Sequence, residues 1–210
     1  MSLLCIPDPA QRADLAVFVE RALRLDEAAV IRLHTRSDGL ISAWVATGFD
    51  VLACRVLAGG LQPPDFTCSA DALSSGLRSP DAAGWCDVGY SLDSAWRTAL
   101  PPETGFYHLD DVPAVVLSGL ARQGAELARE HAGPQGPPPS LLDQEVLHFT
   151  TADGTAAIPM RVVMALVAMG FIADDDQDIV RVRMSPTWLR IDGRYGSVFR
   201  RRGGPSLTVL

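Results

Sequence analysis

Two short segments carry the residue types that catalyse proton transfer or nucleophilic attack. His108 is followed by Asp110 and Asp111, and a histidine beside an orienting carboxylate is able to act as a general base. Cys86 is a candidate nucleophile in a loop, although no histidine adjoins it in the sequence. The two aspartates equally suit a helix start, where negative charge is favourable. A small hydrolase or transferase with a site in the 84–111 region is therefore an alternative interpretation and not the preferred one.

Composition and spacing argue against several other chemistries. All 18 basic residues are arginine, so neither a Schiff-base lysine nor a lysine-bearing phosphate loop can be built. The four cysteines are widely spaced and form no Cys-x-x-Cys pair, so the usual zinc spacing is absent. The acidic segment 174–178 has Ile179 and Ser185 where a calcium loop needs a glycine and an acid. We therefore expect no catalytic residue, no metal and no cofactor.

Positive charge is concentrated at the end of the chain. Residues 179–210 contain seven arginines and one acid, Asp192, for a charge of +6, whereas the whole chain carries −7. Arginines and apolar residues alternate along three expected strands, 179–184, 188–191 and 196–201, so each strand has an arginine-bearing face. The candidate partner-binding residues are Arg181, Arg183, Trp188, Arg190, Phe199 and Arg201.

This arginine and aromatic face predicts a function. Arginines interleaved with aromatic rings suit contacts to phosphate groups and stacked bases, or to an acidic protein surface. We therefore expect a non-enzymatic binding or adaptor protein with an anionic partner, either nucleic acid or acidic protein. The competing interpretation is a solvated face whose arginines pair with the acidic remainder of the chain.

The elements that position this face follow from periodicity and turn residues. A helix beginning at Pro9 is expected, because Leu15, Phe18, Val19 and Ala22 recur at helical spacing. Strands are expected over 29–36, 40–47 and 49–57, and a second long helix over 112–132. Short helices are expected over 69–77 and 91–100, and a further helix over 159–169. Three Asp-Gly pairs between strand-like runs favour antiparallel hairpins. These turns are expected at residues 38–39, 153–154 and 192–193.

The pattern predicts an α+β fold of antiparallel β-hairpins packed with about three main helices. Leu33-His34 before one Asp-Gly turn resembles Leu147-His148 before another, which is compatible with a duplicated helix–hairpin unit; common turn chemistry is the favoured explanation. The expected division is an N-terminal unit over 1–132, a Pro/Gly linker over 133–139 and a smaller unit over 140–210 that docks on the first. Small residues on the 112–132 helix leave a homodimer as a further alternative.

Several segments also resemble a known group of sequences. They are Cys5-Ile6-Pro7-Asp8-Pro9, Ala95-Trp96-Arg97, Met169-Gly170-Phe171 and Arg190 through Phe199. They resemble an uncharacterised protein family of high-GC actinobacteria, a resemblance that covers most of the chain and implies no activity or catalytic residue. The N-terminal segment lacks the basic and apolar regions of a signal peptide, and no apolar stretch is long enough to span a bilayer. A cytoplasmic protein without a membrane partner is expected.

Overall fold

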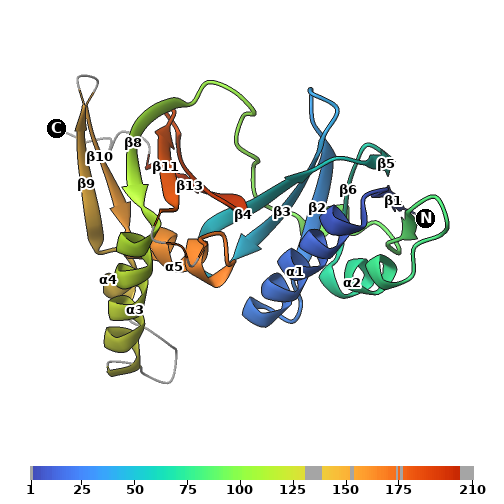
Figure 1. The fold of residues 1–210 in the computed structure, drawn as a ribbon, viewed down its shortest axis with the longest axis horizontal. Helices are drawn as coiled ribbons and strands as arrows, with labels where there is room; N and C mark the ends of the chain where they lie inside the picture. Colours follow the sequence, from blue (N-terminus) through green and yellow to red (C-terminus); the bar gives the residue numbers. More distant parts are fainter. Residues whose placement is uncertain (1, 131–138, 152–153, 174, 176, 204–210) are drawn as a thin grey trace. The chain divides into compact units, whose positions relative to one another are not determined.

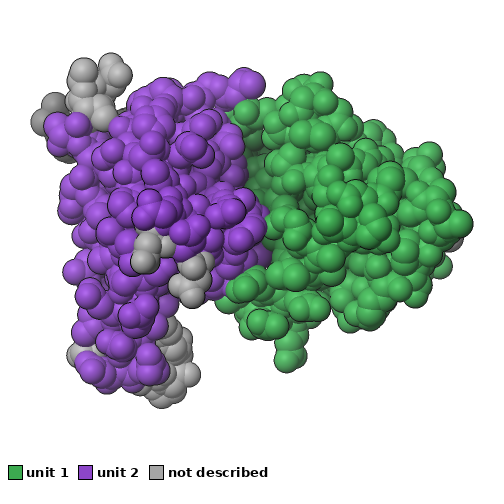
Figure 2. All heavy atoms as spheres, viewed as in Figure 1, with its two compact units in different colours: residues 1–48, 52–103 green, residues 49–51, 104–210 purple. Residues whose placement is uncertain are grey.

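The computed structural model describes residues 2–130, 139–151, 154–173, 175 and 177–203. The chain forms two compact units, drawn in two colours in Figure 2. Unit 1 comprises residues 1–48 and 52–103, and unit 2 comprises residues 49–51 and 104–210. The division therefore differs from the expected one, since the helix expected over 112–132 belongs to unit 2. The expected linker lies almost wholly outside the described residues. None of the described helices combines the length and the hydropathy needed to cross a membrane.

Unit 1 packs two helices against antiparallel strands (Figure 1). Its main strands are ordered β6-β2-β3-β4, and a small sheet is ordered β5-β1-β7. The elements are β1 (Leu3–Cys5), α1 (Pro9–Leu25), β2 (Val30–Thr35), β3 (Ile41–Thr47), β4 (Val51–Leu57), β5 (Gly60–Gln62), β6 (Asp65–Ser69), α2 (Ala70–Arg78) and β7 (Trp85–Asp87). A single 3₁₀ turn, η1 (Asp93–Ala95), replaces the helix that we expected over 91–100.

The first helix forms where the sequence places it. The Asp8 side chain accepts a hydrogen bond from the Ala10 amide, and Pro9 occupies the first turn, where a missing N–H costs nothing. The four apolar positions expected at the core are all buried: Leu15, Phe18, Val19 and Ala22. On β2, Ile31 and Leu33 are fully buried, and the alternate residues Arg32 and His34 lie on the opposite face. The sheet of unit 1 thus has an apolar face and a polar face.

Unit 2 repeats this plan with different strand lengths. Its main strands are ordered β13-β12-β11-β8, and β9 pairs with β10 in a separate hairpin. The elements are β8 (Tyr107–Pro113), α3 (Ala114–Glu130), α4 (Pro139–Leu142), β9 (Glu145–Thr151), β10 (Gly154–Pro159), α5 (Met160–Ala168), β11 (Ile179–Met184), β12 (Trp188–Gly193) and β13 (Gly196–Arg201). The antiparallel α+β class is confirmed. In each unit a long helix precedes a hairpin, α1 before β2–β3 and α3 before β9–β10.

Two details of unit 2 differ from expectation. Strand β12 runs through Asp192 to Gly193, so the turn lies at Arg194-Tyr195, two residues later than the Asp-Gly pair suggested. The turn expected at residues 153–154 includes Asp153, which lies outside the described residues. Helix α3 buries Ala121, Gly124 and Ala128, and it packs on α5 within unit 2 (Figure 1). Of the small residues that suggested a homodimer, Ala121 and Ala128 are buried within the unit, whereas Gly119 and Ala125 are only partly buried. The homodimer stays an untested alternative.

Candidate binding surface

The strand register of unit 2 places all six candidate residues on one face of the sheet. Arg183 lies opposite Arg190 on the neighbouring strand, and Arg190 lies opposite Phe199. Trp188 lies opposite Arg201 in the same way. The side chains that lie between these positions, such as Val182 and Ile191, are fully buried on the other face. The alternation in the sequence therefore predicted correctly which residues share a face.

The two aromatic rings on this face are not available to a partner. Trp188 and Phe199 are only 6% and 5% exposed. The Arg190 guanidinium lies over Phe199, with its central carbon 5.4 Å from the ring centroid, and 5.6 Å from that of Phe106. The two phenylalanine rings meet edge to face at 5.9 Å. The expectation that Trp188 and Phe199 are presented for stacking is corrected: both are buried, and Phe199 lies beneath Arg190.

One carboxylate lies among the arginines of this face. Asp192 accepts a hydrogen bond from Nε of Arg190 at 2.7 Å and another from Oγ of Ser197 at 2.5 Å. Nε of Arg183 lies 3.2 Å from the second carboxylate oxygen of Asp192. Because the Asp192 side chain is only 15% exposed, these contacts are little screened by solvent. Asp192 therefore balances one of two adjacent positive charges and fixes both side chains.

Two arginines of the face have no counter-ion among the described residues. The side chains of Arg181 and Arg201 are exposed, and neither side chain has a hydrogen bond or an ion pair to another described residue. Arg181 lies opposite Asp192 on β12 and opposite Asp111 on β8, but both of those carboxylates have other partners. The exposed positive charge of the surface is therefore located on Arg181 and Arg201, with Arg183 half-buried between other charged groups.

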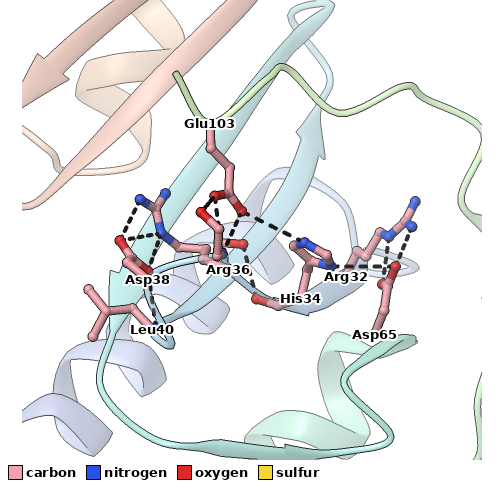
Figure 3. Close-up of polar contacts among 9 residues, drawn as sticks. Arg32, His34, Arg36, Asp38, Leu40, Asp65 and Glu103 are labelled. Carbon is pink, nitrogen blue, oxygen red and sulfur yellow. Dashed lines mark hydrogen bonds and ion pairs between the residues drawn. The ribbon is translucent and has the colours of Figure 1, made fainter. Parts of the chain in front are cut away.

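The polar face of unit 1 is balanced differently (Figure 3). The Arg32 guanidinium donates two hydrogen bonds to the Asp65 carboxylate, at 2.9 and 2.7 Å. This pairing holds the pKa of Asp65 below its usual value, because the ionised carboxylate accepts both bonds. His34 lies 3.5 Å from Asp65 through Nδ1 and 3.9 Å from Glu103 through Nε2. Each positive or protonatable group of this face that Figure 3 draws has a carboxylate beside it.

Glu103 joins the end of unit 1 to the β2–β3 turn. Its carboxylate accepts hydrogen bonds from both the amide and the hydroxyl of Ser37 (Figure 3). These bonds, the side-chain bond above all, lower the pKa of Glu103. Arg36 in turn donates to Asp38 at 2.8 Å and lowers the pKa of that carboxyl as well. No local pattern in the sequence links Glu103 with residues 34–38, because the two segments are far apart along the chain.

The candidate enzyme residues do not form one site. His108 and Asp111 are paired at 2.9 Å on β8 in unit 2, both exposed, whereas Cys86 lies on β7 in unit 1. Cys86 is fully buried, and this burial raises the pKa of its thiol, which opposes formation of a nucleophilic thiolate. In the part of the chain that the structure describes, no three His, Cys, Asp or Glu side chains are grouped to hold a metal ion. Two residues of the acidic segment 174–178 lie outside that part.

Unit 2 also contains a pocket that the sequence did not indicate. It has a volume of about 530 Å³ and lies between the β9–β10 hairpin and the end of β13. Its walls include Phe149, Met184 and Leu189, and its rim includes Arg200, Arg201 and Arg202. Of the six candidate residues, Arg201 alone lines this pocket. The run of three arginines was visible in the sequence, but its neighbour, the β9–β10 hairpin, is brought there only by the fold.

Comparison with solved structures defines the class of fold. The DNA polymerase sliding clamp of Bacillus subtilis matches 99% of this chain and 67% of its own, with a TM-score of 0.59 and 14% identity. The β sliding clamp of Caulobacter crescentus matches 98% and 66%, with a TM-score of 0.57 and 13% identity. The DNA polymerase β subunit of Streptococcus pyogenes matches 97% and 65%, with a TM-score of 0.57 and 13% identity. The protein therefore has a sliding-clamp fold and spans about two thirds of the length of these structures.

Family models divide the chain close to the boundary between the two units. The model described as Domain of unknown function (DUF8185) matches residues 101–205, and the one described as Domain of unknown function (DUF8010) matches residues 1–98. Since the first match covers half of the chain, the protein belongs to the DUF8185 family. No curated protein is similar enough in sequence to count as a match.

Proposed function

We propose that this protein is a non-enzymatic binding or adaptor protein that contacts an anionic partner through the arginine face of β11–β13. The observation that carries the proposal is the register of these strands. It places Arg181, Arg183, Arg190 and Arg201 on one face, with Asp192 as the one carboxylate that the same three strands contribute to it. Excess positive charge on a fixed surface favours an anionic partner over a neutral one.

The contrast with unit 1 supports this assignment. On the polar face of unit 1, Arg32 is matched by Asp65 in a bidentate pair, and Arg36 is matched by Asp38. In unit 2, Arg183 and Arg190 share one carboxylate, while Arg181 and Arg201 have none among the described residues. A surface whose only role is contact with solvent needs no excess of positive over negative charge, particularly in a chain of net charge −7. The surplus is therefore the feature that a partner would recognise.

The chemistry of the surface favours an acidic protein segment over nucleic acid. Base stacking needs exposed rings, and both Trp188 and Phe199 are buried. The guanidinium fork, by contrast, pairs directly with a carboxylate. The solved structures that share this fold are named as DNA polymerase sliding clamps, and one is named as a polymerase β subunit. A non-catalytic component that assembles with other proteins is consistent with that likeness.

Fluorescence anisotropy tests this proposal with three labelled probes: oligoglutamate, single-stranded DNA and duplex DNA. We expect oligoglutamate to bind at low salt and to weaken as salt increases, since surface charges are screened. The double variant Arg181→Ala/Arg201→Ala should weaken binding about tenfold, as two partly solvated charge pairs are lost.

The control variant is Arg97→Ala/Arg122→Ala, which removes the same charge from two exposed arginines outside this face. An equal loss in the two double variants, or no binding of oligoglutamate at low salt, contradicts the proposal. Tighter binding of either DNA that also depends on Arg181 and Arg201 replaces the acidic-protein partner with nucleic acid.

A further inference from the structure

The pocket of unit 2 combines an apolar floor with a cationic rim. Four apolar residues line it, and each is at most 8% exposed: Phe149, Ala156, Met184 and Leu189. Because these side chains are buried, surrounding residues hold the apolar part of the pocket in place. Its volume of about 530 Å³ is within the range of natural small-ligand sites. An apolar group that entered this pocket would therefore meet a preformed surface rather than a flexible one.

Arg200 supplies a buried donor that has no acceptor. Its Nε is buried and makes no hydrogen bond to any described residue. Asp143 lies 3.8 Å from Nη2 of Arg200 and is bound more closely by Arg161, at 2.6 Å. A buried donor without an acceptor is costly in free energy, and a bound anion would remove that cost. Arg200 therefore brings to the pocket a guanidinium whose hydrogen-bonding capacity is incompletely used.

The other charged groups of the pocket are largely committed. Arg202 donates from Nη1 to the Ser185 carbonyl at 3.3 Å, which fixes its direction. Glu145 contacts His148 at 3.1 Å, so the carboxylate that lines the pocket already has a partner. Arg201 is exposed and free to approach a ligand. The pocket thus offers donors for a single negative charge next to apolar walls.

From this arrangement we infer that the pocket binds a carboxylate that is attached directly to an apolar group. The carboxylate is held by Arg200 and Arg201, and the apolar group lies against Met184, Leu189 and Phe149. This chemistry belongs either to a free organic acid or to a peptide segment with adjacent acidic and apolar residues. The site goes beyond the proposed function, because Arg200 lies on the opposite face of the sheet from Arg181 and belongs to the pocket alone. Arg201, near the end of β13, is shared by the two surfaces, so Arg200 and Arg181 are the residues that distinguish them.

Four probes and two variants test this inference by methyl NMR of the full chain. The probes are hexanoate, its neutral analogue hexanamide, inorganic phosphate and an end-blocked peptide of alternating glutamate and leucine. We expect hexanoate or the peptide to shift the Met184 and Leu189 methyl signals in a saturable way. Hexanamide, which lacks the charge, and phosphate, which lacks the apolar group, should each bind at least about tenfold more weakly than hexanoate.

The variant Arg200→Met keeps the apolar stem and removes the donor, and it should weaken binding about tenfold. Arg181→Ala is the control and should leave the Met184 and Leu189 shifts unchanged. If Arg200→Met does not fold, the comparison of hexanoate with hexanamide in the unaltered chain still decides the question. Saturable binding of hexanoate identifies a free acid as a sufficient ligand, and binding of the peptide alone assigns the site to a protein segment.

Three results would overturn the inference: no saturable shift with either hexanoate or the peptide, equal affinity for hexanoate and hexanamide, or unchanged affinity in a folded Arg200→Met variant. Because the oligoglutamate assay depends on Arg181 and Arg201, its failure would remove the proposed function and leave this test standing.

Discussion

Gly124 of α3 lies so close to Met160 of α5 that a Cβ at this glycine would come within 2.7 Å of the Met160 sulfur. Gly119 on the same helix has no atom within 4 Å of the equivalent position. Both positions are helical and only Gly124 is crowded. Substituting each glycine therefore measures the effect of helix packing separately from that of helix propensity.

We expect Gly119→Ala to stabilise the protein by up to about 1 kcal/mol, the usual gain of alanine over glycine in a helix. Gly124→Ala makes the same gain but requires the flexible Met160 side chain to move, which offsets part of it. Urea denaturation should therefore show Gly124→Ala to be less stable than Gly119→Ala. Equal stability of the two variants would mean that the Met160 side chain moves without cost.

Removal of the Asp192 carboxylate should affect stability and binding in opposite directions. In Asp192→Asn the guanidinium groups of Arg183 and Arg190 lose their shared counter-ion, and Arg190 loses its ionised hydrogen-bond acceptor. We expect a loss of about 1–3 kcal/mol in the free energy of unfolding. The arginine face gains one positive charge, so binding of oligoglutamate should become tighter. Asp111→Asn, which alters an exposed carboxylate of the neighbouring strand, should change stability much less. Weaker oligoglutamate binding in Asp192→Asn would contradict the proposed use of this face.

The Arg32–Asp65 pair gives a stability that depends on pH. Because the pKa of Asp65 is lower in the folded chain than in the unfolded one, its contribution is complete above the ordinary aspartate range, near pH 4. The contribution is lost as the pH falls below that range and through the lowered folded pKa. Urea unfolding of the Asp65→Asn variant should therefore show a weaker pH dependence below about pH 4 than the unaltered chain. Parallel pH profiles for the two proteins would exclude this role.

The cysteines should be unreactive in the folded state. All four are buried, and burial raises the pKa of the Cys68 thiol to about 12. A thiol reagent at neutral pH should therefore modify the native chain slowly and modify four thiols in denaturant, since the thiolate is the reactive form. Fast modification of Cys86 in the native chain would revive the hydrolase or transferase interpretation.

The elements of the arginine face were largely predictable from the sequence. The bounds of β11 and β13 agree with the runs read from the alternation, because a strand's side chains change face at every residue. The same alternation correctly grouped Arg181, Arg183, Arg190 and Arg201. The turn after β12 was placed two residues early, since an Asp-Gly pair also fits a strand that continues through it.

Contacts between distant segments were not predictable in this way. On helix α3, the apolar residues Val116 and Leu127 are 41% and 42% exposed, whereas Gly124 lies against Met160 of α5. The residues that bury Phe199 include Phe106, which lies outside the three strands, and no local pattern links the two rings. The hydrogen bond from the Ser37 amide to the Glu103 carboxylate also joins segments that no local sequence pattern connects.

Strand alternation is a local property of the backbone, so the chain by itself determined which arginines point the same way, how charge divides along its length and which secondary structure class it adopts. Exposure and pairing depend on which remote segments come to rest against each side chain. The tertiary structure alone therefore decided that the aromatic rings of this face are buried, that Asp192 contacts two of the arginines, and that Arg200, which lines the pocket, is left with an unmatched donor.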